Sequence, residues 1–143
     1  MKIWEILRAK GSTVHSIHPE ATVFEAVQAL NHHQVGALIV MGTSREVLGI
    51  FTERDVLRRC LKDGKPDLSC PIAAMMTTNV IVGVVEDEVG YAMGVMTQNR
   101  IRHLPVMEGT ALAGLISIGD LVKSQLEETD FENRMLREYI TRA

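Results

Sequence analysis

The sequence predicts an α/β (α+β) protein in which two β-α-β-β-α repeats pack pseudo-symmetrically as one module. The first observation behind this prediction is an internal repeat: a shift of 66 residues places Leu38 on Leu104. After the first hairpin the shift becomes 65 and places Asp55 on Asp120, which a one-residue deletion in a turn explains. The second observation is that strand-like apolar runs alternate with helical periodicity in both copies.

The elements of the first repeat follow from this patterning. They are expected to be a strand at Val14–Ile17, a helix from Thr22, strands at Ala37–Val40 and Val47–Phe51, and a helix from Glu53 to about Leu61. Thr22 is the expected N-cap of the first helix, because Glu25 three residues later completes a capping-box signature.

The second repeat shows the same order of elements. They are expected to be strands at Val80–Val84, His103–Val106 and Leu112–Ile116, and helices at Tyr91–Gln98 and Asp120–Leu126. The first of these helices departs from its counterpart, because Glu88 replaces the threonine cap and Gly90 and Gly94 lie inside the helix. These glycines indicate either a weak helix or a close helix–helix approach at a subunit contact.

The predicted organisation has five segments. They are an N-terminal helix at 1–13, the first repeat at 14–61, a polar linker at 62–70, the second repeat at 71–127 and a C-terminal helix at 128–143. Pro71 is expected to open a short helix capped by Ser69 or Cys70, and Thr129 or Asp130 to cap the C-terminal one. The C-terminal helix carries an apolar stripe formed by Phe131, Met135, Leu136, Tyr139 and Ile140. We expect this stripe to pack on its own domain or on a twin chain, with recognition of another partner as the alternative.

Composition excludes several classes of function. The chain has 143 residues, a formal net charge of -3 and 4% aromatic residues. It therefore lacks both the basic face of a phosphate-backbone binder and the rings of a single-strand binder, and nucleic acid is not an expected partner. No apolar run approaches the ~20 residues of a membrane span, and two cysteines make no disulfide framework. We expect a cytoplasmic protein without membrane contact.

The sequence holds no pattern typical of a catalytic or metal centre. Its histidines are scattered, and the adjacent pair His32-His33 points to different helix faces. Cys60 and Cys70 have no histidine or aspartate at a spacing that would activate a nucleophile. We therefore expect no enzyme activity and no metal.

One motif occurs at equivalent places in both repeats. Thr52 and Asp55, and likewise Ser117 and Asp120, place a hydroxyl where a strand ends and a carboxylate three residues later. The pattern is a capping-box variant, which needs no function. The same geometry also suits a nucleotide, because helix N–H groups attract phosphate and an aspartate accepts the hydroxyls of a ribose.

The strings VGALIV…LGIFTERDVLRR and IRHLPVM…AGLISIGDLVKS resemble the two halves of a tandem cystathionine-β-synthase (CBS) domain pair, or Bateman module. The resemblance covers about Val14 to Gln125, and the closing FENRMLREYI is similar to the tail of small stand-alone bacterial members. It implies adenosyl nucleotide binding in clefts between the repeats and dimerisation through helices.

The resemblance also implies two sets of binding residues. Asp55 would hold a ribose, with Thr52 and Arg54 near the phosphates, and residues of the other repeat would border this ligand: Ile101, Arg102 and His103. The second site would use Ser117, Gly119 and Asp120, bordered by Val35, Gly36 and Ala37. Because Gly36 stands where the second repeat has Arg102, the Asp120 site lacks one cation, and we expect the Asp55 site to bind more tightly.

These expectations lead to a regulatory sensor that binds AMP, ADP or ATP, with NAD or S-adenosylmethionine as further candidates, and that requires no cofactor. It would be a homodimer that signals through a conformational change to a partner protein. The alternative is a structural homodimerisation module whose aspartates are only helix caps.

Overall fold

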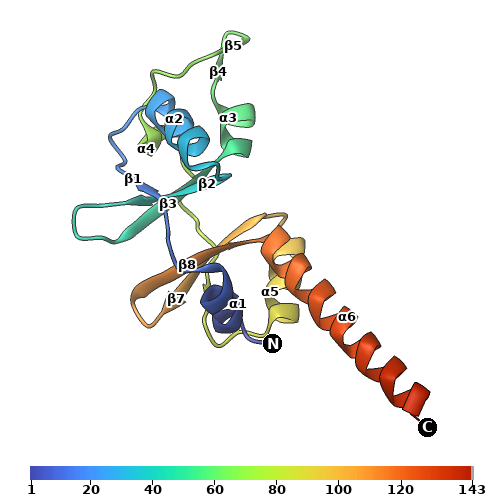
Figure 1. Cartoon of the computed structure of the whole chain (residues 1–143). Coiled ribbons are helices and arrows are strands. Elements are labelled where there is room, and N and C mark those ends of the chain that lie inside the picture. The colour runs from blue at the N-terminus through green and yellow to red at the C-terminus, as the bar shows by residue number, and fades with distance from the viewer. Residues whose placement is uncertain (143) are drawn as a thin grey trace. The chain divides into compact units, whose positions relative to one another are not determined.

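The computed structural model describes residues 1–142 and divides into two compact units (Figure 1). The repeat-1 unit is the continuous segment Thr13–Ile81. The repeat-2 unit combines Met1–Ser12 with the chain from Val82 onward. Each unit contains one three-stranded sheet with helices, so the predicted α+β fold with two repeats is confirmed.

The repeat-1 unit is built around a sheet of order β1-β2-β3. Strand β1 pairs in parallel with β2, and β2 pairs antiparallel with β3. Its elements are β1 (Ser16–Ile17), α2 (Val23–His33), β2 (Ala37–Met41), β3 (Val47–Thr52), α3 (Glu53–Arg59), β4 (Leu61–Lys62), β5 (Lys65–Pro66) and α4 (Ile72–Met75). The predicted polar linker therefore contains part of a small hairpin, β4-β5, that periodicity could not reveal.

The repeat-2 unit reproduces this sheet as β6-β7-β8, again with one parallel and one antiparallel pair. Its elements are α1 (Ile3–Lys10), β6 (Gly83–Val84), α5 (Val89–Gln98), β7 (His103–Glu108), β8 (Ala111–Ser117) and α6 (Ile118–Arg142). Within residues 1–142, no helix is both long enough and apolar enough to cross a membrane.

The two antiparallel hairpins share an irregularity that confirms the internal repeat. The register shifts between Val40 and Met41 in one hairpin and between Val106 and Met107 in the other. Beyond the shift, Met41 pairs with Val47, six positions on, whereas Met107 pairs with Leu112, five positions on. The one-residue deletion thus lies in the hairpin turn, where loops tolerate it.

Helix caps follow the predictions in part. The Thr22 hydroxyl accepts a hydrogen bond from the Glu25 N–H, as expected for an N-cap. Ser69 and Cys70 do not cap α4: Pro71 itself occupies the N-cap position. The Ser69 and Cys70 side chains instead donate to the Asp67 carboxylate, at 2.6 and 3.2 Å. These hydrogen bonds engage the two side chains that were expected to cap the helix.

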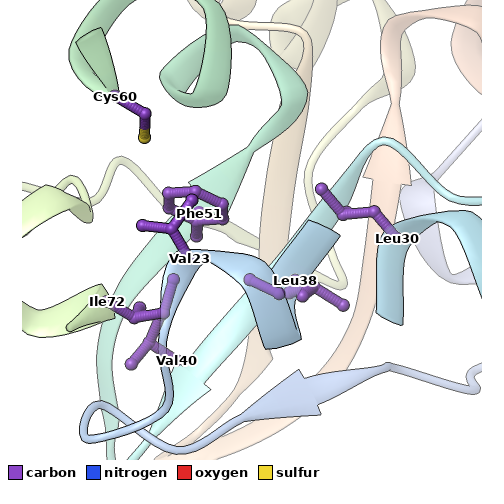
Figure 2. Close-up of a cluster of buried hydrophobic side chains, with 8 residues drawn as sticks. Val23, Leu30, Leu38, Val40, Phe51, Cys60 and Ile72 are labelled. Atoms are coloured by element: carbon purple, nitrogen blue, oxygen red, sulfur yellow. The ribbon is translucent and has the colours of Figure 1, made fainter. Parts of the chain in front are cut away.

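The core of the repeat-1 unit joins α2, the sheet and α4 (Figure 2). Phe51 of β3 and Val23 of α2 are fully buried within it, and Ile72 brings α4 into the same cluster. The buried members are Val23, Ala26, Leu30, Leu38, Val40, Phe51, Cys60 and Ile72. Burial raises the pKa of the Cys60 thiol, with the nearby Asp55 charge adding to the effect, so this thiol behaves as a core residue.

Each sheet is completed by the helix that precedes the other repeat in the chain. Helix α1 joins the repeat-2 unit, where the Ile3 N–H donates to the Asp87 carbonyl at 2.9 Å. Helix α4 joins the repeat-1 unit through the equivalent bond, from the Ile72 N–H to the Ala21 carbonyl at 2.8 Å. The structure thus groups α4 with the first repeat, although the sequence places Pro71 at the start of the second.

A glycine in the last strand makes room for each of these packed segments. A Cβ on Gly114 would lie 2.6 Å from the Leu7 side chain of α1. A Cβ on Gly49 would lie 2.6 Å from the Thr77 carbonyl oxygen, just after α4. The glycine at the equivalent position of each repeat is therefore explained by the close approach of a packed segment to the strand.

The C-terminal region differs from the sequence expectation. Helix α6 runs without a break from Ile118 to Arg142, so neither Thr129 nor Asp130 begins a separate helix. The apolar stripe beyond Thr129 does not pack on the repeat-2 unit, because its side chains are exposed. Gly90 and Gly94 face open space within the described chain, with no heavy atom within 4 Å of a Cβ placed on either.

Candidate functional site

The first motif lies where β3 ends and α3 begins. Thr52 is the N-cap of α3: its hydroxyl accepts the Asp55 N–H at 3.3 Å, and the Asp55 carboxylate accepts the Thr52 N–H at 2.9 Å. The pattern therefore forms a reciprocal capping box. The Asp55 side chain is 11% exposed, and Arg59 Nε lies 3.6 Å from its second oxygen. Asp55 is a buried, charged group at the edge of the sheet.

The second motif has the same geometry where β8 passes into α6. The Asp120 carboxylate accepts the Ser117 N–H at 2.8 Å, and the Ser117 hydroxyl accepts the Asp120 N–H at 3.1 Å. Its side chain is 27% exposed, more than that of Asp55. The two predicted motifs therefore form the same local structure and differ in how far the carboxylate is open to solvent.

A lysine from α1 forms an ion pair with the Asp120 carboxylate. Lys10 Nζ lies 2.5 Å from Asp120 Oδ2 and donates a second hydrogen bond to the Leu115 carbonyl at 3.0 Å. Burial of the Asp120 carboxyl raises its pKa, but the hydrogen bonds from Lys10 and Ser117 outweigh burial and hold the pKa below its usual value. Asp120 is thus an ionised carboxylate that already has a cationic partner.

The segments expected to border the ligand lie beside the motifs of their own units. The Gly36 carbonyl accepts the Glu53 N–H at 3.0 Å, and Ala37 pairs with Thr52 across the sheet. In the repeat-2 unit the Arg102 carbonyl accepts the Ile118 N–H at 2.8 Å, and His103 pairs with Ser117. Each unit therefore assembles one half of the predicted residue set, and the crossed pairing of the halves stays a prediction.

The remaining predicted site residues vary in exposure. Arg54 and Ile101 are half-buried, as is Val35, whereas Arg102 and Gly119 are exposed. Arg102 lies directly before β7, and its expected contact with a ligand phosphate stays a prediction.

Sequence comparison of the repeats did not assign Lys10 or Arg59 to a site. Arg59 could have been found, because it lies four residues after Asp55 on the same helix. Lys10 gave no such signal, because 110 residues separate it from Asp120. The comparison of Gly36 with Arg102 predicted one cation fewer at the Asp120 site. Lys10 is a cation beside Asp120 that this comparison could not reveal.

No metal centre is evident in the described part of the chain, where no three His, Cys, Asp or Glu residues gather in a way that could hold an ion. The rings of His15 and His33 stack at 3.8 Å, and His33 meets His32 edge to face. This group is a surface ring stack.

Comparison with known proteins places the chain among related sequences. The model of the CBS domain family matches residues 11–62 and 72–127. The mitochondrial CBS domain-containing protein CBSX3 of Arabidopsis thaliana is 35% identical over 96% of this chain and 71% of its own length.

Two solved structures show the same fold. The CBS-domain containing protein ATU1752 from Agrobacterium tumefaciens is 37% identical, with a TM-score of 0.84 over 87% of this chain and 99% of its own. The CBS domain protein PAE2072 from Pyrobaculum aerophilum, solved in complex with AMP, is 25% identical, with a TM-score of 0.73 over 84% of this chain and 89% of its own.

Proposed function

Because this chain belongs to the CBS domain family, we propose that it is a regulatory module that binds an adenosyl nucleotide. The observation that carries the proposal is the duplicated strand-end motif, with an aspartate in each copy, in a chain whose structural relative was solved with AMP. A carboxylate beside backbone N–H groups suits a ribose diol next to a phosphate, so the donors and acceptors present fit such a ligand.

In this proposal Asp55 and Asp120 each accept the hydroxyls of one ribose. Thr52 and Arg54 lie near the phosphates of the first ligand, with Ile101, Arg102 and His103 on its other side. Ser117 and Gly119 serve the second ligand, with Val35, Gly36 and Ala37 on its other side. The chain holds the nucleotide without turning it over, and the ligand acts by favouring one packing of the module over another.

We propose that the Asp55 site binds more tightly than the Asp120 site. At Asp120 a ribose has to compete with Lys10, whose ammonium contacts Oδ2 of the same carboxylate. At Asp55 the basic neighbour is farther away, with Arg59 Nε 3.6 Å from the carboxylate. Calorimetry with AMP is expected to show two classes of site, and Asp55→Asn to remove the tighter one.

The test compares isosteric variants with a matched control. Asp55→Asn and Asp120→Asn keep an oxygen for the capping hydrogen bond but remove the charge that orients a ribose. Asp130→Asn changes a carboxylate that is 71% exposed on α6 and should leave binding unchanged. Titration with AMP, ADP, ATP, NAD and S-adenosylmethionine identifies the ligand. Loss of the weak site in Asp55→Asn and of the tight one in Asp120→Asn would reverse the assignment.

The capping boxes support a second candidate function. Because Asp55 and Asp120 already satisfy helix N-termini, they could serve only the fold, and the chain would then be a structural homodimerisation module. In that case no heat and no thermal shift appear at millimolar nucleotide, and mass spectrometry finds no nucleotide released from the denatured protein. Conversion of ATP to product by the pure protein would overturn both candidates.

Both candidate functions include a homodimer. Under the regulatory proposal the twin chain or a separate partner protein reads the ligand-dependent packing. Hydrogen exchange measured with and without AMP tests this step, because a ligand that favours one packing changes protection beyond the residues that it touches.

A further inference from the structure

The C-terminal half of α6 carries an apolar face, interrupted by Glu132, that the rest of its unit does not cover. Phe131, Met135 and Tyr139 follow one another at a spacing of four residues and are 63%, 53% and 75% exposed. Leu136 and Ile140 widen the same face and are 60% and 71% exposed. Figure 1 shows this part of α6 running away from the sheet and the other helices of the repeat-2 unit.

An exposed face of this kind is expected to be covered by another surface. Contiguous apolar patches of this kind on otherwise polar proteins mark interaction sites. In addition, most helical stability in proteins comes from the packing of an apolar face. The segment is helical throughout its described length, although the apolar side chains named above stay exposed.

The charges along α6 favour one orientation for a second copy of the helix. Residues 127–132 hold four acidic side chains and no basic one, whereas residues 133–142 hold three arginines and one glutamate. A second copy laid antiparallel and centred on Met135 places residues 127–132 of each helix beside residues 138–143 of the other, which hold one glutamate and one arginine. A second copy laid parallel places like charges together, which is unfavourable. The antiparallel orientation therefore has weaker repulsion between the two helices than the parallel one.

We propose that α6 pairs antiparallel with α6 of a second copy, around a two-fold axis near Met135. Phe131 then packs against the partner's Tyr139, and Met135 against the partner's Met135. The contact is isologous, so both copies use the same face and the assembly closes at two chains. This proposal deepens the homodimer of the previous section by naming its surface, and it does not depend on nucleotide binding.

The first test measures the oligomeric state of the full chain by sedimentation equilibrium. Met135→Glu places two carboxylates together at the axis and should raise the dimer dissociation constant about 100-fold or more, as expected for loss of a central buried anchor. Thr141→Glu adds the same charge on the opposite side of the helix and should leave the constant within a few-fold of the parent. Unchanged melting of both variants shows that the units still fold.

The second test determines orientation by disulfide trapping, in a background with Cys60 and Cys70 replaced by serine. When Phe131→Cys and Tyr139→Cys proteins are mixed and oxidised, antiparallel pairing yields the mixed disulfide. Predominant like-with-like disulfides would overturn the antiparallel arrangement.

The outcomes separate this proposal from the general homodimer. A parent chain that dimerises while Met135→Glu dimerises equally well overturns the α6 contact and leaves the homodimer in place through another surface. A parent chain that stays monomeric at all concentrations overturns both. Binding of a monomeric chain to phosphatidylcholine vesicles through α6 would show that the face meets lipid, and this also overturns the proposal.

Discussion

Removal of the Lys10 ammonium should destabilise the repeat-2 unit by a measurable amount. Lys10→Met keeps most of the apolar stem and breaks the bond to Asp120, whose side chain is 27% exposed against 37% for Lys10. Fully exposed pairs contribute about 0.2–1 kcal/mol, and hydrogen bonds to buried charges about 1.5–3 kcal/mol. For this partly screened pair we expect about 1 kcal/mol, which corresponds to about 4 °C in melting temperature for a chain of this size.

The chain provides a direct assay for this unit. Its single tryptophan, Trp4, lies in α1 of the repeat-2 unit, so fluorescence follows the unfolding of the unit that contains the ion pair. A double-mutant cycle with Asp120→Asn isolates the coupling of the two side chains, which we expect to be about 1 kcal/mol. Arg134→Met is the control, because its pair with Asp130 is highly exposed and should contribute little.

The pH dependence supplies a second check. The folded pKa of Asp120 lies below its unfolded value, so the interaction is present above the unfolded pKa and is lost as pH falls through the folded one. The difference between the parent and Lys10→Met should therefore persist at neutral pH and shrink in acid, below about pH 4. Zero coupling at neutral pH, or a difference that stays constant in acid, would show that the Lys10–Asp120 ion pair does not stabilise the unit.

Three further predictions test the packing and charge of the two units. Gly49→Ala should cost about 1–3 kcal/mol in urea unfolding, because its Cβ meets the Thr77 carbonyl oxygen, whereas Gly94→Ala should stabilise by up to about 1 kcal/mol. The reverse order would contradict the packing described. Ile72→Ala should cost about 2–5 kcal/mol, since the side chain is fully buried, and a calorimetric melt that hardly moves would show that α4 is dispensable. Hydrogen bonds from the Ser69 side chain and backbone lower the pKa of Asp67 from 3.8 to about 2, so its stabilisation is present above about pH 4 and is lost between these values. An acid titration of Asp67→Asn should lack that step, and identical acid unfolding would contradict it.

Local patterns were sufficient to predict the repeated elements and the two motifs. The capping boxes at Thr52 and Ser117 involve groups three residues apart, so spacing alone placed them. The hairpin deletion was visible because the two strands are joined by a short turn, so the shift between the repeats changes from 66 to 65 within a few residues. Features of this range depend little on the rest of the chain.

Features that depend on distant residues could not be predicted. Helix α1 packs in the unit whose sheet is formed by residues beyond Val82. The helical periodicity of α1 predicts an apolar face, but it does not indicate which sheet that face contacts. For the same reason Lys10 could not be assigned to Asp120. The absence of a break near Thr129 in α6 had a different cause, because good cap residues are also tolerated inside a helix.

The exchange of α1 and α4 between the repeats changes what counts as a separable piece of this chain. The segment Thr13–Ile81 is continuous and is in effect inserted into the unit formed by Met1–Ser12 and the later residues. A protease cut between Ser12 and Thr13 would leave α1 attached only through non-covalent contacts, with Ile3 fully buried, Leu7 against Gly114 and Lys10 bonded to Asp120. A fragment cut at the boundaries of the second repeat, 72–127, would carry α4 away from its core and lack the helix that covers its own sheet. A circular permutant that begins at Thr13 and joins the old termini by a linker would instead keep each folding unit contiguous in sequence.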